Sequence, residues 1–171
     1  MQQGYGINFI DFKKYSVAGT FFIWGEKIKG QELLIAKMDQ AEHEIGNHSF
    51  THPDFKQLTE KDIQREIDET DKAIQQATGK QKIWFSPPFG HLLENQRKNI
   101  DKKITLWTLD SQDWKEETTM EEIYRNVTKH WQHGDVILLH CNERTAQALP
   151  DIIKAMQKEG IEGCTMSTLK K

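Results

Sequence analysis

Two histidines set four residues apart, His48 and His52, are the side chains in this sequence best suited to binding a metal ion. On a helical turn, residues i and i+4 lie on one face, so both imidazoles would reach the same divalent cation. The small polar residues Asn47 and Ser49 favour a tight hydrogen-bonded turn here, and Pro53 ends it. The spacing alone also fits a simpler structure, in which one ring caps a turn and the other packs in a half-buried site.

Polar residues or prolines also follow three apolar runs further along the chain. The segments after these runs carry Asp110 and Asp113, then His140, and the pair Pro87 and Pro88. The loops that follow parallel strands meet at one face of a β/α barrel. We therefore expect these residues to gather at the same face as the two histidines.

The elements that would position these residues alternate between strand and helix. Predicted strands cover the apolar runs 17–25, 43–46, 82–85, 104–109 and 135–140, with a weak last strand at 164–166. One predicted helix ends near residue 15. Four further helices are predicted over residues 31–40, 59–78, 119–131 and 146–159. The clearest helix begins at the N-cap Thr59 and ends at Gly79. This alternation predicts an α/β fold with a parallel sheet covered by helices.

Length and composition favour one domain, residues 1–171, because this length suffices for one sizeable core. The net charge is −3, which argues against a nucleic acid or an anionic membrane surface as partner. No apolar run approaches the ~18 residues of a membrane span, and the first residues lack signal-peptide features. We expect a soluble protein, cytoplasmic as the sequence is written and extracytoplasmic if its N-terminus is truncated. Cys141 and Cys164 form no Cys-x-x-Cys pattern, and we expect both to be buried free thiols.

Five segments of the chain resemble, in order, the motifs of the polysaccharide deacetylase family, carbohydrate esterase family four. The segments are Gly19-Thr-Phe-Phe, His48-Ser-Phe-Thr-His52, Ser86-Pro-Pro-Phe-Gly90, Asp110-Ser-Gln-Asp-Trp114 and Ile137-Leu-Leu-His140. They span nearly the whole chain, and five motifs in order are far more specific than any one of them. The resemblance implies a distorted, incompletely closed (β/α) barrel. It also implies hydrolysis of acetamido groups on an N-acetylated glycan, or of acetyl esters on xylan.

The resemblance assigns roles to particular side chains. His48 and His52 would bind Zn²⁺ or a similar divalent ion, which activates a water and polarises the acetyl carbonyl. His140 would be the general acid that protonates the leaving amine, and Asp113 would orient its ring. A substrate pocket would be lined by Trp114, Leu138, Pro88 and Phe89.

Two departures from the family pattern bear on activity. The family's first motif carries two aspartates, the catalytic base and the third metal ligand, and Gln2 and Gln3 stand in their places. A neutral amide cannot act as the base, and its oxygen is a weaker ligand, so Gln3 is a doubtful third ligand. Ser86 replaces the arginine that orients the base. We also expect the first strand of the barrel to be missing, because the sequence begins at Met1.

The sequence leaves several interpretations open. In one, the sequence is a fragment, or the start of its gene is wrongly assigned. In another, it is a folded but inactive family member that binds a glycan or a protein partner. In a third, it is an active deacetylase in which the metal-bound water or another residue replaces the base. A different class, an interaction module, would form a homodimer through the sheet edge that the missing strand exposes.

Overall fold

The computed structural model describes residues 12, 14–81 and 84–169. The chain forms two compact units, one of residues 20–106 and one that joins residues 107–169 to the described residues before 20. The expectation of one domain over residues 1–171 stays a prediction.

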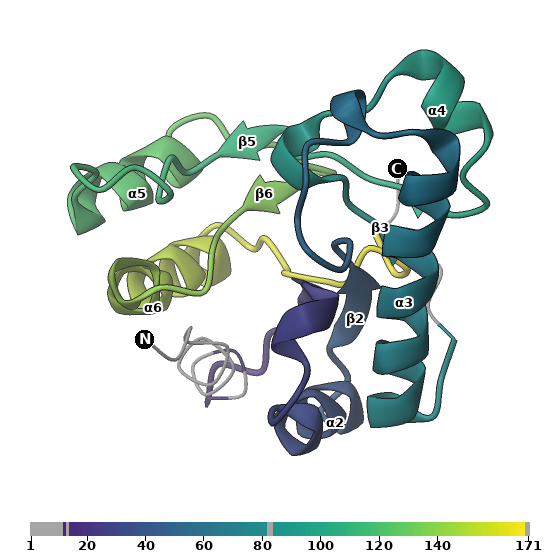
Figure 1. The fold of residues 1–171 in the computed structure, drawn as a ribbon. Coiled ribbons are helices and arrows are strands. Elements are labelled where there is room, and N and C mark those ends of the chain that lie inside the picture. The colour runs from purple at the N-terminus through teal and green to yellow at the C-terminus, as the bar shows by residue number, and fades with distance from the viewer. Residues whose placement is uncertain (1–11, 13, 82–83, 170–171) are drawn as a thin grey trace. The chain divides into compact units, whose positions relative to one another are not determined.

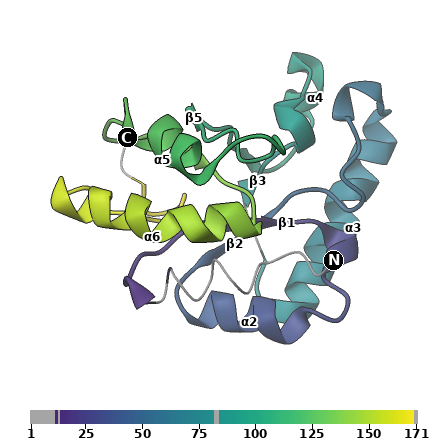
Figure 2. The ribbon, with the colours of Figure 1, turned by 90° about the vertical axis from the view of Figure 1, so that its left-hand side faces the viewer.

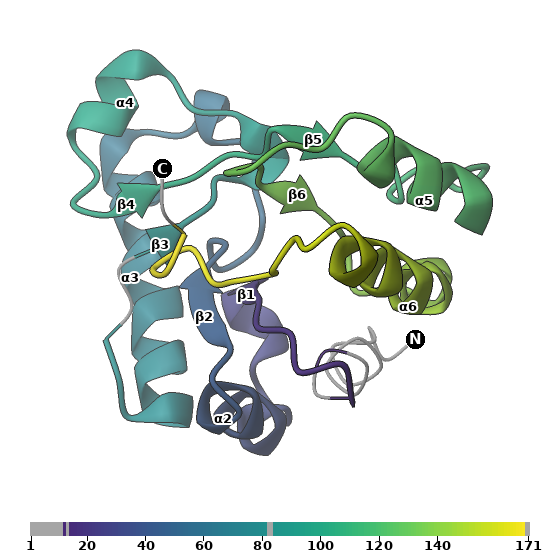
Figure 3. The same ribbon diagram turned by 180° about the vertical axis from the view of Figure 1, so that it is seen from behind.

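The 20–106 unit contains a four-stranded parallel sheet (Figure 3). Its strands are β1 (Thr20–Ile23), β2 (Glu44–Asn47), β3 (Trp84–Phe85) and β4 (Lys103–Ile104), in the order β1-β2-β3-β4. The register pairs Phe22 with Gly46 and Phe85 with Ile104. A Cβ on Gly46 would lie 2.5 Å from the Phe22 ring, so glycine allows this ring to cross β2.

Three helices belong to this unit (Figure 1): α2 (Glu32–Gln40), α3 (Glu60–Thr78) and α4 (Glu94–Lys98). The predicted limits of α3 are confirmed: the Thr59 side chain accepts from the N–H of Asp62, and Gly79 ends the helix with φ 71°. The short helix α4 was not predicted. Short 3-10 turns follow β1, β2 and β3, namely η1 (Gly25–Lys27), η2 (Phe55–Gln57) and η3 (Pro88–Gly90).

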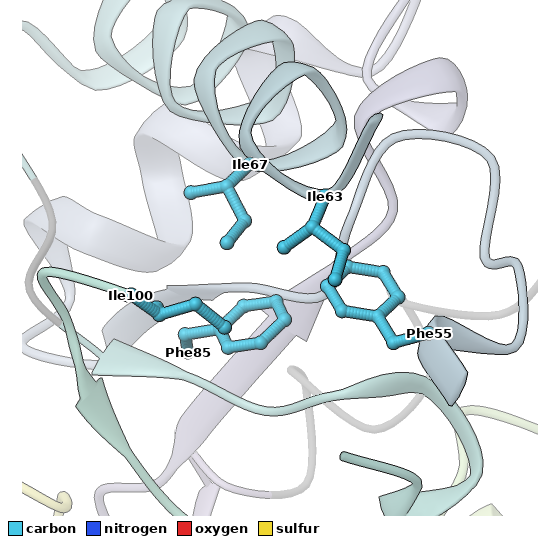
Figure 4. Packing of buried hydrophobic residues seen from close by; sticks show 5 residues of the cluster. All are labelled: Phe55, Ile63, Ile67, Phe85 and Ile100. Carbon is cyan, nitrogen blue, oxygen red and sulfur yellow. The ribbon is translucent and has the colours of Figure 1, made fainter. Parts of the chain in front are cut away.

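The core of this unit lies between α3 and the sheet (Figure 4). Ile63 and Ile67 project from one face of α3 and pack with the aromatic rings of Phe55 and Phe85, which lie against each other at a tilt of 30°. Ile100 completes the cluster. Isoleucines four residues apart give the helix one apolar face, and burial of that face holds the loop after β2 and the end of β3 against α3.

The other unit has a two-stranded parallel sheet, β5 (Leu109–Asp110) and β6 (Ile137–Leu138). Helices α5 (Met120–Thr128) and α6 (Glu143–Lys158) lie side by side (Figure 2). Their contact buries Ile123 and Val127 of α5 against Ala148 and Ile152 of α6. The side chains of Thr119 and Asn142 cap the two helices by accepting backbone N–H bonds.

Several predicted boundaries are wrong. The run 104–109 is not one strand: its two ends belong to β4 and β5, which lie in different sheets. Between them Leu106 is exposed, and the Thr108 hydroxyl bonds to Asp135 instead of packing in a strand. Residues 164–166 form no strand, and Cys164 is exposed rather than buried. Helix α6 begins three residues earlier than expected and α5 ends three residues earlier.

The predicted α/β fold with parallel sheets that do not close is confirmed. The expected absence of a first strand concerns the start of the sequence, where residues 1–11 lie outside the described residues. Over the described ranges, no helix is both long enough and apolar enough to cross a membrane.

Candidate functional site

The turn after β2 brings the rings of His48 and His52 together. Their centroids lie 4.9 Å apart, with the ring planes at 64°. The predicted helical turn is wrong, because residues 48–54 have no helical structure. Instead Ser49 and His52 adopt left-handed backbone conformations, with φ of 64° and 60°. The N–H of His52 donates to the Ser49 hydroxyl oxygen at 3.1 Å, which closes the turn.

The ring of His48 is oriented by the main chain of Ser86. Its Nδ1 lies 2.7 Å from the Ser86 carbonyl oxygen. A carbonyl can only accept, so Nδ1 carries the hydrogen and Nε2 keeps its lone pair. A backbone carbonyl on the second ring nitrogen is a typical outer contact of a metal-binding histidine. Ser86 itself is buried, and its N–H donates to the Asn47 carbonyl, so this contact comes from the pairing of adjacent strand ends.

Aromatic rings hold the second imidazole. His52 stacks on Trp24 with centroids 4.1 Å apart, and Phe89 meets it at 4.7 Å. Phe89 lies in η3 with a left-handed φ of 57° and is 57% exposed. At the end of the same loop, His91 Nδ1 lies 3.0 Å from Asp54, and this hydrogen bond holds the pKa of the Asp54 carboxyl below its usual value. The loop that carries Phe89 is thus tied back to the chain just after His52.

The two imidazoles suit a divalent metal as half of a ligand set. The chemistry of the donors fits, because His48 Nε2 is left as an acceptor and the rings adjoin each other. Over residues 12, 14–81 and 84–169, no three His, Cys, Asp or Glu side chains gather into a set that could hold a metal ion. The doubtful third ligand, Gln3, and its neighbour Gln2 lie outside the described residues.

The second pair of predicted residues, Asp113 and His140, forms a compact hydrogen-bonded unit after β5 and β6. Asp113 Oδ1 lies 2.7 Å from His140 Nδ1, and Oδ2 accepts the His140 backbone N–H at 2.6 Å. Asp113 is fully buried, whereas the His140 side chain is 48% exposed. Because the carboxylate accepts the hydrogen on Nδ1, the lone pair of the neutral ring lies on Nε2, the nitrogen that can take up or give a proton.

The surroundings of Asp113 favour its charged form. Burial raises the pKa of this carboxyl, but hydrogen bonds from His140 and Thr145 outweigh burial and bring the pKa below its usual value. The neighbouring Cys141 responds in the opposite direction, since burial and the charge of Asp113 raise the pKa of its thiol to about 12. Asp113 is therefore a fixed negative charge beside the His140 ring, and Cys141 stays a neutral thiol.

Three residues that sequence reasoning missed support this pair from the start of α6. The Thr145 hydroxyl donates to Asp113 Oδ2 at 2.5 Å. Asn142 and Arg144 donate to the Asp113 carbonyl oxygen at 3.4 and 3.2 Å, and Arg144 also binds the carbonyls of the next loop residues. The Asn-Glu-Arg-Thr segment after Cys141 is an N-cap signal, and it would have placed the helix start here.

The proposed pocket residues are distributed over both units. Trp114 is 56% exposed, and its indole N–H donates to Asp110 at 3.4 Å. Leu138 is half-buried in β6, where its register partner is Asp110. In the 20–106 unit, Pro88 is buried in η3, and its neighbour Phe89 in the same turn is exposed. The structure thus brings together the pair His48 and His52 within one unit, and the pair Asp113 and His140 within the other.

Comparison with known proteins identifies the relatives of this chain. A model of the polysaccharide deacetylase family matches residues 11–106. Over 167 residues the chain is 35% identical to the peptidoglycan-N-acetylmuramic acid deacetylase PdaA of Bacillus subtilis, a match that covers 93% of this chain and 64% of PdaA. The chain spans 64% and 50% of the first two curated relatives, so it matches about half to two thirds of their length.

Solved structures with the same fold include a deacetylase and a pseudoenzyme. The peptidoglycan deacetylase PdaC of Bacillus subtilis matches with a TM-score of 0.89 and 29% identity, over 95% of this chain and 81% of that one. A CE4 family pseudoenzyme of Bacillus anthracis matches with a TM-score of 0.89 and 28% identity, over 95% of this chain and 59% of that one. A mutant of that pseudoenzyme with restored enzymatic activity has the same TM-score.

Proposed function

This chain belongs to the polysaccharide deacetylase family, and we propose that it is a metal-dependent hydrolase of acetamido or acetyl ester groups on a carbohydrate polymer, with impaired competence. The observation that carries the proposal is the pair of preformed histidine sites. His48 has its Nδ1 on a carbonyl, and His140 has its Nδ1 on the Asp113 carboxylate. In each neutral ring Nδ1 carries the hydrogen and the lone pair lies on Nε2, which suits a metal ligand in one case and a proton-transfer group in the other.

On the metal side, His48 and His52 would hold Zn²⁺ or a similar divalent ion. Such an ion polarises the acetyl carbonyl and lowers the pKa of a bound water. Stacking of His52 on Trp24 and the Ser86 carbonyl on His48 hold the two rings in place before any ligand binds. This preorganisation limits the loss of side-chain freedom on binding.

On the acid side, His140 would protonate the leaving amine through Nε2. The buried Asp113 carboxylate holds the ring through Nδ1 and supplies a counter-charge when the imidazole is protonated. Trp114 and Leu138 would form walls of the acetyl pocket, while Pro88 and Phe89 would contact the sugar beside the metal. Phe89 in one unit and Trp114 in the other each expose an aromatic ring, and such a ring suits the apolar face of a sugar.

The residues at three positions are the reason to expect impaired catalytic activity. Gln2 and Gln3 stand where the family has its base and third metal ligand, and an amide neither accepts a proton at neutral pH nor binds metal as well as a carboxylate. At Ser86 the main chain still orients His48, but the buried serine side chain offers no cation to orient a base. The similarity to a Bacillus anthracis pseudoenzyme supports this part of the proposal.

The second candidate is an inactive member that binds a glycan or a protein partner. The same three positions favour it, together with a relative named as a pseudoenzyme. The two candidates differ in one outcome, since only the first releases acetate. The name of PdaA suggests N-acetylated peptidoglycan fragments as the first substrate to test, with chitooligosaccharide and acetylated xylan beside them.

The test is the restored variant Gln2→Asp, Gln3→Asp, Ser86→Arg, assayed for acetate release in zinc-replete buffer beside the unchanged chain. We expect slow or undetectable release from the unchanged chain and a clear gain in the restored variant. His140→Ala in the restored background is the control and should abolish the gain. A folded, zinc-loaded restored variant that still releases no acetate would refute the hydrolase proposal, and glycan binding without hydrolysis would favour the second candidate.

A further inference from the structure

One buried carboxylate, Glu66 of α3, binds the turn that separates His48 from His52. Its Oε2 accepts the N–H groups of Phe50 and Thr51 at 2.8 and 2.7 Å, and its Oε1 accepts the Thr51 hydroxyl at 2.8 Å. Only 7% of Glu66 is exposed. All of these donors lie between the two histidines in sequence, so the carboxylate sets the path of the backbone from one ring to the other.

A second attachment fixes the start of the same turn. The side-chain amide of Asn47, the last residue of β2, donates to the Ile67 carbonyl at 2.9 Å and to Asp71 at 2.8 Å. Its oxygen accepts the N–H of Ser49 at 2.8 Å. Asp71 in turn pairs with Lys102. Neighbouring turns of α3 therefore form hydrogen bonds with the chain on both sides of His48.

The turn depends on such support because its backbone is unfavourable by itself. Ser49 and His52 hold φ values near +60°, a region that residues other than glycine rarely adopt. A buried carboxylate is also costly unless donors surround it, and here the turn supplies those donors. Loss of Glu66 would free the Phe50 and Thr51 amides, and the turn could relax toward ordinary φ values that move the imidazoles apart.

We propose that Glu66 is a positioning residue of the metal half-site, which holds His48 and His52 at the separation that one divalent ion requires. The inference rests on the proposed function for the metal. A carboxylate that served only the fold would change the stability of the protein but not the zinc affinity of the folded molecules. Zinc affinity is therefore the quantity that separates positioning from stability.

The experiment compares zinc affinity by chelator competition, well below the unfolding temperature, in the full chain and three variants. Glu66→Ala should bind zinc 10- to 100-fold more weakly, as is usual for the loss of a group that orients metal ligands. Glu66→Gln should stay within a few-fold of the unchanged chain, since its oxygen can accept both N–H groups while its NH₂ donates to the Thr51 oxygen. Glu69→Ala, an exposed glutamate on the same helix, is the matched control and should change nothing.

A folded Glu66→Ala protein with undiminished zinc affinity would overturn the inference. Should Glu66→Ala fail to fold, Thr51→Val replaces it, because it removes one donor at an exposed position; a several-fold loss of affinity is then expected, and no loss overturns the inference. Amide hydrogen exchange at Phe50 and Thr51 gives a readout without metal, and faster exchange is expected in Glu66→Ala. If the unchanged chain bound no zinc, the proposed function would fail first, whereas zinc binding unaffected by Glu66 would refute the positioning role alone.

Discussion

Replacing Thr145 by valine removes one hydroxyl from the acid site and leaves the shape of the side chain unchanged. That hydroxyl donates to Asp113 Oδ2 at 2.5 Å, and both residues are fully buried. Oδ2 would keep only the His140 backbone N–H. A hydrogen bond to a charged group contributes about 1.5–3 kcal/mol to the free energy of unfolding. For a chain of this length each kcal/mol lowers Tm by about 2–4 °C, so we expect a loss of about 3–12 °C at neutral pH.

The pH dependence gives a sharper test of the same interaction. In the folded protein the pKa of Asp113 lies below its ordinary value of 3.8, so its charged form stabilises the fold above that value. This contribution is lost as pH falls through the folded pKa. Thr145→Val raises the folded pKa, because one donor to the carboxylate is gone. The difference in unfolding free energy between the two proteins should therefore be largest near pH 7 and shrink in acid.

Urea unfolding at pH 7 and at about pH 3 measures both effects, with Thr128→Val as the control. Thr128 donates its hydroxyl to the neutral Tyr124 carbonyl within α5, so its loss should cost less and show no such pH dependence. Equal destabilisation by Thr145→Val at both pH values would refute the assignment of a charged Asp113 held by this hydroxyl.

Three further outcomes follow from the local structure. Asn142→Ala removes the N-cap of α6 and should lower the unfolding free energy by about 1 kcal/mol in urea; an unchanged midpoint would contradict the capping role. At pH 8 in the native protein, a thiol reagent should modify the exposed Cys164 quickly and Cys141 only after unfolding, since the pKa of Cys141 is about 12; equal rates would refute that environment. Gly79→Ala should destabilise the protein by about 1 kcal/mol in thermal unfolding because the helix end has φ 71°, and a more stable variant would contradict that conformation.

Local signals in the sequence predicted those elements whose causes are local. Thr59, the isoleucines four residues apart and Gly79 predicted α3 correctly, because caps and apolar periodicity act within one segment. The prediction of one strand over 104–109 is wrong because an apolar, β-branched composition favours a strand but does not determine which sheet the strand joins. Its two ends pair with different partners, and pairing is set by residues far away in sequence.

The site residues divide in the same way. His48 with His52, and Asp113 with His140, were found by motif order, and the structure pairs them as expected. The residues that hold these pairs were not found. Glu66 lies 15 residues from Thr51, and the contact between them forms only when α3 packs on the sheet. The predicted helix began after Thr145, so the hydrogen bond between Thr145 and Asp113 was not predicted.

Zinc content and zinc affinity of the purified full chain, measured beside the double variant His48→Ala, His52→Ala, test the central claim most directly. The account predicts one zinc per chain, held by the unchanged protein and lost in the double variant, because the two rings adjoin and the tautomer of His48 leaves Nε2 as a ligand. Zinc binding no greater than the background of the double variant would contradict it. The fold would then serve binding rather than metal-dependent hydrolysis.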